Sequence, residues 1–152
     1  MELREAKPSD AAAIGDLTRQ AYAKWVPLIG REPKPMTVDY ELAVRRHRFD
    51  LLLSNGQLVA LIETVDEGEQ LLIENLAVAP DFQRRGFGRF LLAHAEQLAG
   101  NLGKSCVRLY TNQRFVENIR LYERVGYRID REEDYGVGIA IHMSKAVRPK
   151  AG

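Results

Sequence analysis

The chain has 152 residues, of which 45% are hydrophobic and 28% charged, as expected of one soluble globular domain with a sizeable core. Lys and Arg total 22 against 21 Asp and Glu, so the net charge near +1 gives no general attraction to nucleic acid or to an anionic membrane. No apolar stretch reaches the length of a membrane span, the charged N-terminus lacks a signal-peptide core, and the single cysteine cannot form an internal disulfide. We therefore expect a cytoplasmic protein with one domain over residues 1–147 and a flexible tail, residues 148–152.

The first third of the chain predicts a strand and two helices. Residues 2–6 read as the strand, and Ser9 is the expected N-cap of a first helix that ends near Trp25. Apolar residues recur in this helix at helical spacing: Ile14, Leu17, Ala21 and Tyr22. A second helix is expected over residues 39–48.

Residues 26–35 join these helices and hold three prolines and Gly30, which predicts a loop or a broken helix. The segment is unusually apolar for a loop. Two interpretations are equally open: one wall of an acceptor pocket, or a loop held on the core by its own apolar side chains.

The rest of the chain reads as a hairpin followed by alternating strands and helices. Asn55-Gly56 between two strand runs is a strong hairpin signal, and residues 71–78 are apolar enough for a central strand. The remaining predicted elements are a long helix to Leu102, a strand over 106–111, a helix over 116–125, a strand from 126, a turn in the acidic run 130–134 and a last strand over 138–145. The order β-α-α-β-β-β-α-β-α-β-β predicts an α/β (α+β) fold with a central mixed sheet and helices on both faces.

Residues 83–88 form a glycine-rich turn between the central strand and the long helix. The first N–H groups of a helix lack partners and its dipole is positive there, so this point attracts anions. Glycines allow a ligand to approach the backbone, and Arg84, Arg85 and Arg89 add positive charge. The pattern favours a phosphate-binding turn over an ordinary bend.

Two motifs point to one family. Gln83, Gly86 and Gly88 fill the pattern Q/R-x-x-G-x-G/A, and a second segment, Asn118-Ile119-Arg120-Leu121-Tyr122, precedes Gly126-Tyr127. In both motifs and in element order the chain resembles the GNAT superfamily of acyl-CoA-dependent N-acyltransferases. The resemblance covers nearly the whole chain.

The resemblance implies that acetyl-CoA is the acyl donor. The strand backbone should pair with the pantetheine arm and the glycine turn should hold the pyrophosphate. The implied cofactor contacts are Leu76, Ala77, Val78, Gln83, Arg84, Arg85, Gly86, Phe87, Gly88, Arg89, Asn118 and Tyr122. The resemblance further implies that the Tyr122 hydroxyl protonates the leaving thiolate and that the Val78 N–H is an oxyanion donor.

Acyl transfer to an amine needs a base, because an alkyl amine with a pKa of about 10.4 is protonated at neutral pH. Glu74 lies in the buried strand on the same face as residues 76 and 78, so it is the candidate base. A structural ion pair with an arginine explains Glu74 equally well, and Glu63 is a weaker second candidate for the base. Cys106 reads as a packed core thiol.

The expected activity is therefore transfer of an acetyl group to a primary amine of a small molecule or peptide, by direct attack in a ternary complex. Tyr22, Trp25 and Tyr40 are the expected acceptor contacts, and the resemblance suggests a homodimer. The alternative is a non-catalytic acyl-CoA sensor. His, Cys and carboxylate spacing predicts no metal site, and the absence of Gly-Lys-Ser/Thr argues against a P-loop protein.

Overall fold

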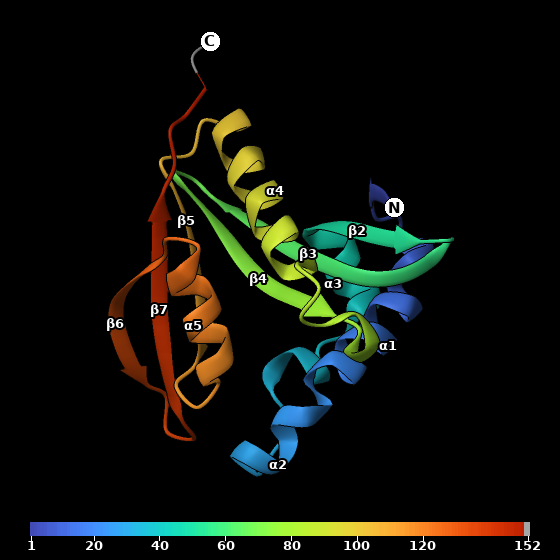
Figure 1. Cartoon of the computed structure of the whole chain (residues 1–152), viewed down its shortest axis with the longest axis horizontal. Helices are drawn as coiled ribbons and strands as arrows, with labels where there is room; N and C mark the ends of the chain where they lie inside the picture. The colour runs from blue at the N-terminus through green and yellow to red at the C-terminus, as the bar shows by residue number, and fades with distance from the viewer. Residues whose placement is uncertain (151–152) are drawn as a thin grey trace. The chain divides into compact units, whose positions relative to one another are not determined.

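The computed structural model describes residues 1–150, whose strands form one seven-stranded mixed sheet in the order β1-β2-β3-β4-β5-β7-β6 (Figure 1). The strands are β1 Glu2–Glu5, β2 Arg48–Ser54, β3 Gln57–Glu67, β4 Gln70–Val78, β5 Cys106–Asn112, β6 Arg128–Asp134 and β7 Ile139–Ala146. The helices are α1 Ala11–Tyr22, α2 Val26–Ile29, α3 Tyr40–Arg46, α4 Phe87–Asn101 and α5 Val116–Arg124. The predicted fold class is confirmed, and the four-residue α2 is the one addition to the predicted order among these helices and strands.

The chain divides into two compact units. The N-terminal unit comprises Met1–Thr64 and Asn75–Leu91, and the C-terminal unit comprises Val65–Glu74 and the chain from Leu92 onward. Strands β3 and β4 and helix α4 each contribute residues to both units. Within residues 1–150, no helix combines the length and the apolar character needed to cross a bilayer.

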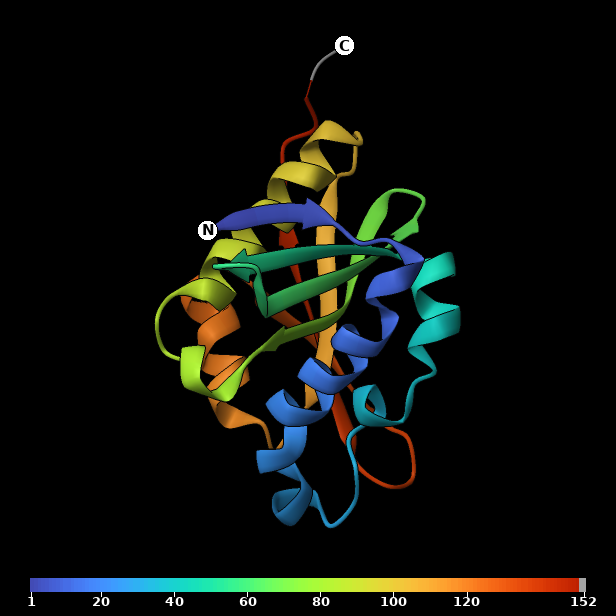
Figure 2. The ribbon, with the colours of Figure 1, turned by 90° about the vertical axis from the view of Figure 1, so that its right-hand side faces the viewer.

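In the N-terminal unit, antiparallel strands β1, β2 and β3 carry α1 and α3 on one face (Figure 2). The β2–β3 turn is closed by Asn55 and Gly56, whose φ values of 52° and 78° are both left-handed, as a two-residue hairpin turn requires. The hairpin prediction is therefore confirmed. The core of this unit gathers apolar side chains from the helices and the strands: Ile14, Leu17, Ala21, Tyr40, Ala43, Phe49, Leu51, Leu61 and Ala77.

In the C-terminal unit, β5 runs parallel to the start of β4, with Gln70–Ile73 in register with Cys106–Leu109. Strand β7 pairs antiparallel with both β5 and β6, which places β6 at the edge of the sheet (Figure 1). The buried apolar residues of these strands and of α5 include Val107, Leu109, Tyr122, Ile141 and Met143.

The acidic run 130–134 was predicted to be a turn, but in the structure it is part of β6. It pairs with β7 from Glu132↔Ile141 to Asp134↔Ile139, and the chain reverses over residues 135–138, where Tyr135 N–H bonds to Gly138 O. All residues of β6 are exposed, so the charged side chains remain in water while the backbone pairs. The sheet register overrides the poor strand propensity of the acidic residues.

The predicted N-cap of the first helix is also wrong. Ser9 does not cap it; instead Asp10 accepts hydrogen bonds from the Lys7 N–H and from the Arg4 guanidinium, and helix α1 begins at Ala11. Helix α1 ends at Tyr22 and a 3-10 turn, Ala23–Trp25, follows it directly, so the helical segment ends at Trp25 as predicted. Pro27 lies inside α2, in its first turn, where a proline costs no helical hydrogen bond. The predicted broken helix is thus confirmed.

Hydrogen bonds hold the last residue of the predicted domain, Val147, and one residue of the predicted tail, Lys150. The Val147 N–H donates to Ser105 O and the Lys150 N–H to Gly100 O, at the end of α4. The rest of the predicted flexible tail, residues 151–152, lies outside the described residues.

Candidate functional site

The glycine-rich turn holds two left-handed residues close together. Arg84 has a φ of 64° and Gly86 a φ of 88°, while Gln83 is extended with a φ of −69°. Left-handed residues in a turn can direct neighbouring backbone N–H groups toward one anion. A non-glycine residue in this conformation is strained, and such strain is common at ligand-binding turns.

Helix α4 begins directly after this turn. The Phe90 N–H donates to Gly86 O over 3.0 Å, so the N–H groups of residues 87–89 precede the first helical bond and have no helical acceptor. The side chains of Arg84, Arg85 and Arg89 are exposed around this point. The turn and the helix start therefore combine free N–H donors with positive charge.

Aromatic rings support the turn from within the same unit. The Phe82 and Phe87 rings lie 6.0 Å apart, and the Arg85 guanidinium lies 5.1 Å from the Phe82 ring centre. Residues 82 and 87 flank the left-handed pair, so their contact holds the two ends of the turn together.

Gln83 joins the turn to strand β4 through its side chain. Its Nε2 donates to the carbonyl of Val78 over 3.0 Å, and its Oε1 accepts from Lys24 Nζ over 3.0 Å. The start of the turn is thereby connected to Val78, which is predicted to contact the cofactor. Lys24 also lies over the Trp25 ring, 4.8 Å from its centre.

Strand β4 presents two different faces. Glu74, Leu76 and Val78 are partly exposed, whereas Asn75 and Ala77 are buried at 3% and 1% exposure. The strand period therefore places Glu74 on the same accessible side as the backbone predicted to hold the pantetheine arm.

Glu74 has a hydroxyl partner. The Tyr110 hydroxyl on β5 donates to Glu74 Oε1 over 2.7 Å, within the C-terminal unit. Sequence reasoning missed Tyr110, because a partner 36 residues away leaves no local signal. A hydrogen-bonded carboxylate at a partly exposed position fits a base that must be held in one orientation.

Asn118 and Tyr122 lie one turn apart on α5. Asn118 is partly exposed, and Tyr122 is buried with its ring 6.0 Å from the ring of Tyr127. Burial raises the pKa of the Tyr122 phenol to about 12. The hydroxyl therefore keeps its proton throughout the neutral range, as a hydrogen-bond donor to a leaving group must.

The three predicted acceptor contacts differ in exposure. Trp25 is partly exposed. Tyr22 is partly exposed and its hydroxyl donates to Asn75 Oδ1 over 2.9 Å. Tyr40 is 5% exposed and its hydroxyl donates to Pro35 O over 2.7 Å, so little of its surface is available for a direct contact.

Glu63, the weaker candidate for the base, is bonded to a histidine. It is 3% exposed, and its Oε2 lies 2.6 Å from Nδ1 of His47, just after the C-terminus of α3. A buried carboxylate with a histidine partner is satisfied as part of the fold. Glu74 is the better placed of the two acids.

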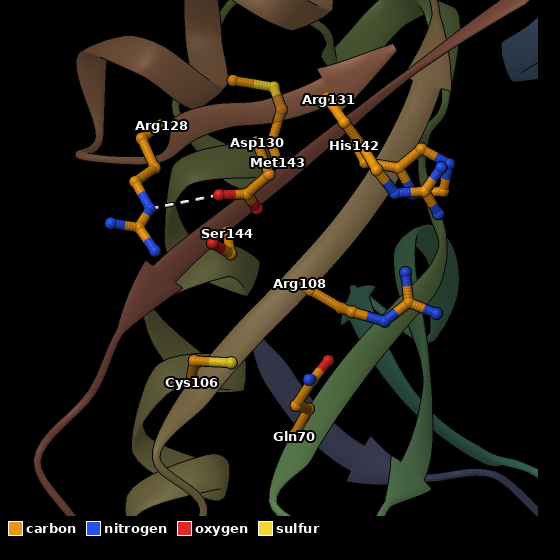
Figure 3. A pocket seen from close by; sticks show the side chains of 9 residues that line it. All are labelled: Gln70, Cys106, Arg108, Arg128, Asp130, Arg131, His142, Met143 and Ser144. Carbon is orange, nitrogen blue, oxygen red and sulfur yellow. Dashed lines mark hydrogen bonds and ion pairs between the residues drawn. The ribbon is translucent and has the colours of Figure 1, made fainter. Parts of the chain in front are cut away.

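A depression of about 420 Å³ lies on the sheet of the C-terminal unit (Figure 3). Its lining includes Arg108, Arg128 and Arg131, but Figure 3 shows the guanidiniums of Arg108 and Arg128 pointing away from each other. Arg108 is held by Glu67 at 2.7 Å and Arg128 by Asp130 at 3.1 Å. The arginines therefore do not converge on an anion.

Metal-binding geometry is absent from residues 1–150, where no three His, Cys, Asp or Glu side chains are grouped to hold an ion.

Cys106 is a free cysteine, and burial raises the pKa of its thiol, which disfavours the nucleophilic thiolate.

Comparison with known proteins identifies relatives over most of the chain. The model of the acetyltransferase (GNAT) family matches residues 14–127. The chain is 30% identical over 147 residues to the uncharacterized N-acetyltransferase YhfO of Bacillus subtilis (strain 168), covering 90% of this chain and 93% of that one. It is 33% identical over 76 residues to the [ribosomal protein bS18]-alanine N-acetyltransferase of Escherichia coli (strain K12), covering 50% of this chain and 51% of that one.

Solved structures show the same fold. The ribosomal-protein-S18-alanine N-acetyltransferase of Escherichia coli superposes with a TM-score of 0.78 at 24% identity, covering 99% of this chain and 96% of that one. The PaiA N-acetyltransferase of Thermoplasma acidophilum, solved in complex with coenzyme A, superposes with a TM-score of 0.81 at 17% identity, covering 96% of this chain and 99% of that one. Motifs, fold and relatives agree, and the chain belongs to the GNAT family of acyltransferases.

Proposed function

We propose that the chain transfers an acetyl group from acetyl-CoA to a primary amine of a small molecule or peptide. The observation that carries the proposal is the left-handed pair Arg84 and Gly86 opening into the N-terminus of α4. The N–H groups of residues 87–89, which have no acceptor within the helix, and the positive charge of the neighbouring arginines suit a pyrophosphate. The N-acetyltransferase of Thermoplasma acidophilum that shares this fold was solved with coenzyme A, which supports the same donor here.

The donor is held by the residues named from the family resemblance. The turn from Gln83 to Arg89 binds the pyrophosphate, the backbone of residues 76–78 pairs with the pantetheine arm, and Asn118 contacts the cofactor. The Val78 N–H donates to the thioester oxygen as charge develops on it.

Transfer proceeds by direct attack. Glu74, held by Tyr110, removes a proton from the acceptor ammonium, directly or through water. The neutral amine attacks the thioester carbonyl, so that a C–N bond forms and the C–S bond breaks. The nitrogen of the new amide loses its second proton to water. The Tyr122 hydroxyl donates its proton to the departing thiolate, and the phenolate regains a proton from solvent.

The test is acetyl-CoA-dependent thiol release against a panel of polyamines, amino acids, aminoglycosides and short peptides, with calorimetric CoA binding alongside. Release with one class of amine supports the proposal and names the acceptor chemistry. Tyr122→Phe and Glu74→Gln should then each lower kcat by about 100-fold, the contribution typical of acid–base catalysis, and leave CoA binding intact.

Two outcomes contradict the proposal. Tight CoA binding without release across the panel favours a non-catalytic acyl-CoA sensor, in which Tyr122→Phe and Glu74→Gln leave function unchanged. Absence of CoA binding removes the role assigned to the turn.

A further inference from the structure

A buried amide connects the helices of the N-terminal unit to strand β4. Asn75 is 3% exposed, and three side-chain hydroxyls meet it from other elements. Its Oδ1 accepts from the Tyr22 hydroxyl over 2.9 Å, and its Nδ2 lies 3.2 Å from Thr18 Oγ1 and 3.3 Å from the Tyr40 hydroxyl.

The hydrogens of this network run in one direction. The Tyr40 proton is donated to Pro35 O over 2.7 Å, so the Tyr40 oxygen must accept from Asn75. This assigns Nδ2 to the side facing Tyr40 and Thr18, and leaves Oδ1 to accept from Tyr22. Donation therefore runs from Tyr22 through Asn75 and Tyr40 to Pro35, an arrangement in which each bond polarises the next.

The partners of Asn75 enclose one segment of the chain. Tyr22 is the last residue of α1 and Tyr40 the first residue of α3, and residues 23–39 lie between them. The single amide thus holds both ends of this segment, which contains Trp25. It holds them at the strand position directly before Leu76, Ala77 and Val78. The Tyr22 hydroxyl also lies 3.3 Å from the carbonyl of Leu76.

We infer that Asn75 is a positioning residue for the amine acceptor: it holds residues 23–39 in place as one wall of the acceptor site. The inference rests on the proposed function, because it assigns this segment to acceptor binding. Asn75 faces away from the accessible side of β4, so it acts through Tyr22 and Tyr40. Its loss should weaken acceptor binding while the pyrophosphate turn, built from residues 83–89, still binds CoA.

The first test measures hydrogen exchange and needs no turnover. In Asn75→Leu, backbone amides of residues 23–39 should exchange about tenfold faster, because their local opening loses its restraint. Amides of β5 and α5 in the C-terminal unit should be unchanged. Unaltered exchange over residues 23–39 would overturn the inference.

The second test separates acceptor from donor. With the amine identified by the thiol-release panel, Asn75→Leu should raise the acceptor KM by about tenfold or more, since misplacement of a binding wall is costly. The Kd for CoA should stay within about twofold of its original value. An unchanged acceptor KM, or equal losses for both substrates, would contradict a positioning role.

If the Asn75→Leu variant does not fold, milder variants test the same inference. Tyr22→Phe and Tyr40→Phe each remove one hydroxyl, and their effects on acceptor KM should be less than additive in the double variant, because both act through the Asn75 amide. Thr18→Ser retains a hydroxyl and should keep the original KM, whereas Thr18→Val should raise it.

A matched control is Asp50→Asn. Asp50 is also a buried polar residue of the N-terminal unit, 2% exposed and bonded to Arg48 at 3.0 Å, but it belongs to β2 and lies outside the network. It should destabilise the fold without changing the acceptor KM. If the wild-type chain acetylates no amine, the proposed function fails, and the restraint by Asn75 is then judged on hydrogen exchange alone.

Discussion

The Tyr110 hydroxyl donates to Oε1 of Glu74 over 2.7 Å and links β5 to β4. The two strands pair through Ile73 and Leu109, so this bond lies one residue beyond the last pair in register on each strand. Tyr110 also stacks near His142, with ring centres 5.7 Å apart, which restrains the phenol ring. A carboxylate held by a restrained donor has a defined orientation.

Tyr110→Phe should therefore lower kcat for amine acetylation by about tenfold, less than Glu74→Gln, because the carboxylate remains but loses its orienting bond. Steady-state kinetics with the identified amine measures this. Tyr135→Phe is the control, since Tyr135 is 45% exposed on the β6–β7 turn. Equal effects of the two variants would argue against the positioning role of Tyr110.

The turn before α4 predicts a difference between two glycines. Gly86→Ala should destabilise the fold by about 1–2 kcal/mol, because its φ of 88° disfavours a Cβ, and should weaken CoA binding about tenfold. Gly56 has a φ of 78°, and a Cβ at either position meets no atom within 4 Å. Gly56→Ala should cost similar stability and leave CoA affinity unchanged. Calorimetry together with urea denaturation distinguishes the two effects.

Tyr122 predicts alkaline destabilisation. Its pKa rises from 10.0 to about 12 on folding because the phenol is buried. Below pH 10 both states are protonated and stability is independent of this group. Between pH 10 and 12 the unfolded state loses the proton first, so stability falls by up to about 3 kcal/mol. Burial raises the pKa of Tyr127 in the same direction.

Tyr122→Phe removes its share of this dependence. Urea denaturation at pH 9 and pH 11 should show a smaller loss for the variant than for the wild-type chain, with the remainder due to Tyr127. An identical loss in both proteins would show that the Tyr122 phenol is not desolvated in the folded chain.

Substitution of Lys104 should lower the stability of the fold at a position away from the proposed site. Its side chain is 8% exposed. Its ammonium contacts Asp66 and donates to Gly68 O over 2.6 Å, closing the turn between β3 and β4. Lys104→Met leaves that carbonyl without its donor and should destabilise the fold by about 1–3 kcal/mol. The hydrogen bond from Lys104 lowers the pKa of the Asp66 carboxyl, so this contribution is present above the ordinary pKa of 3.8 and is lost as the pH falls below it.

Denaturation of Lys104→Met at pH 7 and pH 3 tests this. The variant should lose less stability on acidification than the wild-type chain, while CoA affinity stays the same. A larger acid sensitivity in the variant would contradict the assignment.

Two local turn signals were read correctly from the sequence, although the expected Ser9 cap was not. Asn55-Gly56 specifies its turn through left-handed φ values, and the glycines of residues 83–88 announce a turn that the structure shows to contain a left-handed pair. Both turns depend on residues that adopt a positive φ at low cost, so the residue types within the turn are enough to predict them. Helix α5 and its pair Asn118 and Tyr122 follow from helical spacing in the same way.

Hydrogen-bond partners that are far apart in the chain could not be predicted from the sequence. Tyr22 and Asn75 are 53 residues apart in the chain, and Glu74 and Tyr110 are 36 apart, so no window of sequence contains both members. Asn75 itself stood out as a polar residue in an apolar strand, a signal of buried hydrogen bonding that could have identified it. The acidic run was assigned to a turn because pairing with β7 has no local signature.

Strand β6 carries that run at the edge of the sheet, and all of its residues except Ile129 are charged. An edge strand offers unpaired backbone groups to any other extended chain, which is the usual route to fibrils. A second strand that paired with β6 would bring its side chains against the carboxylates of Glu132, Glu133 and Asp134 and remove part of their hydration, which costs free energy. The acidic residues thus hinder aggregation at β6, one of the two edges at which another strand could be added to the sheet.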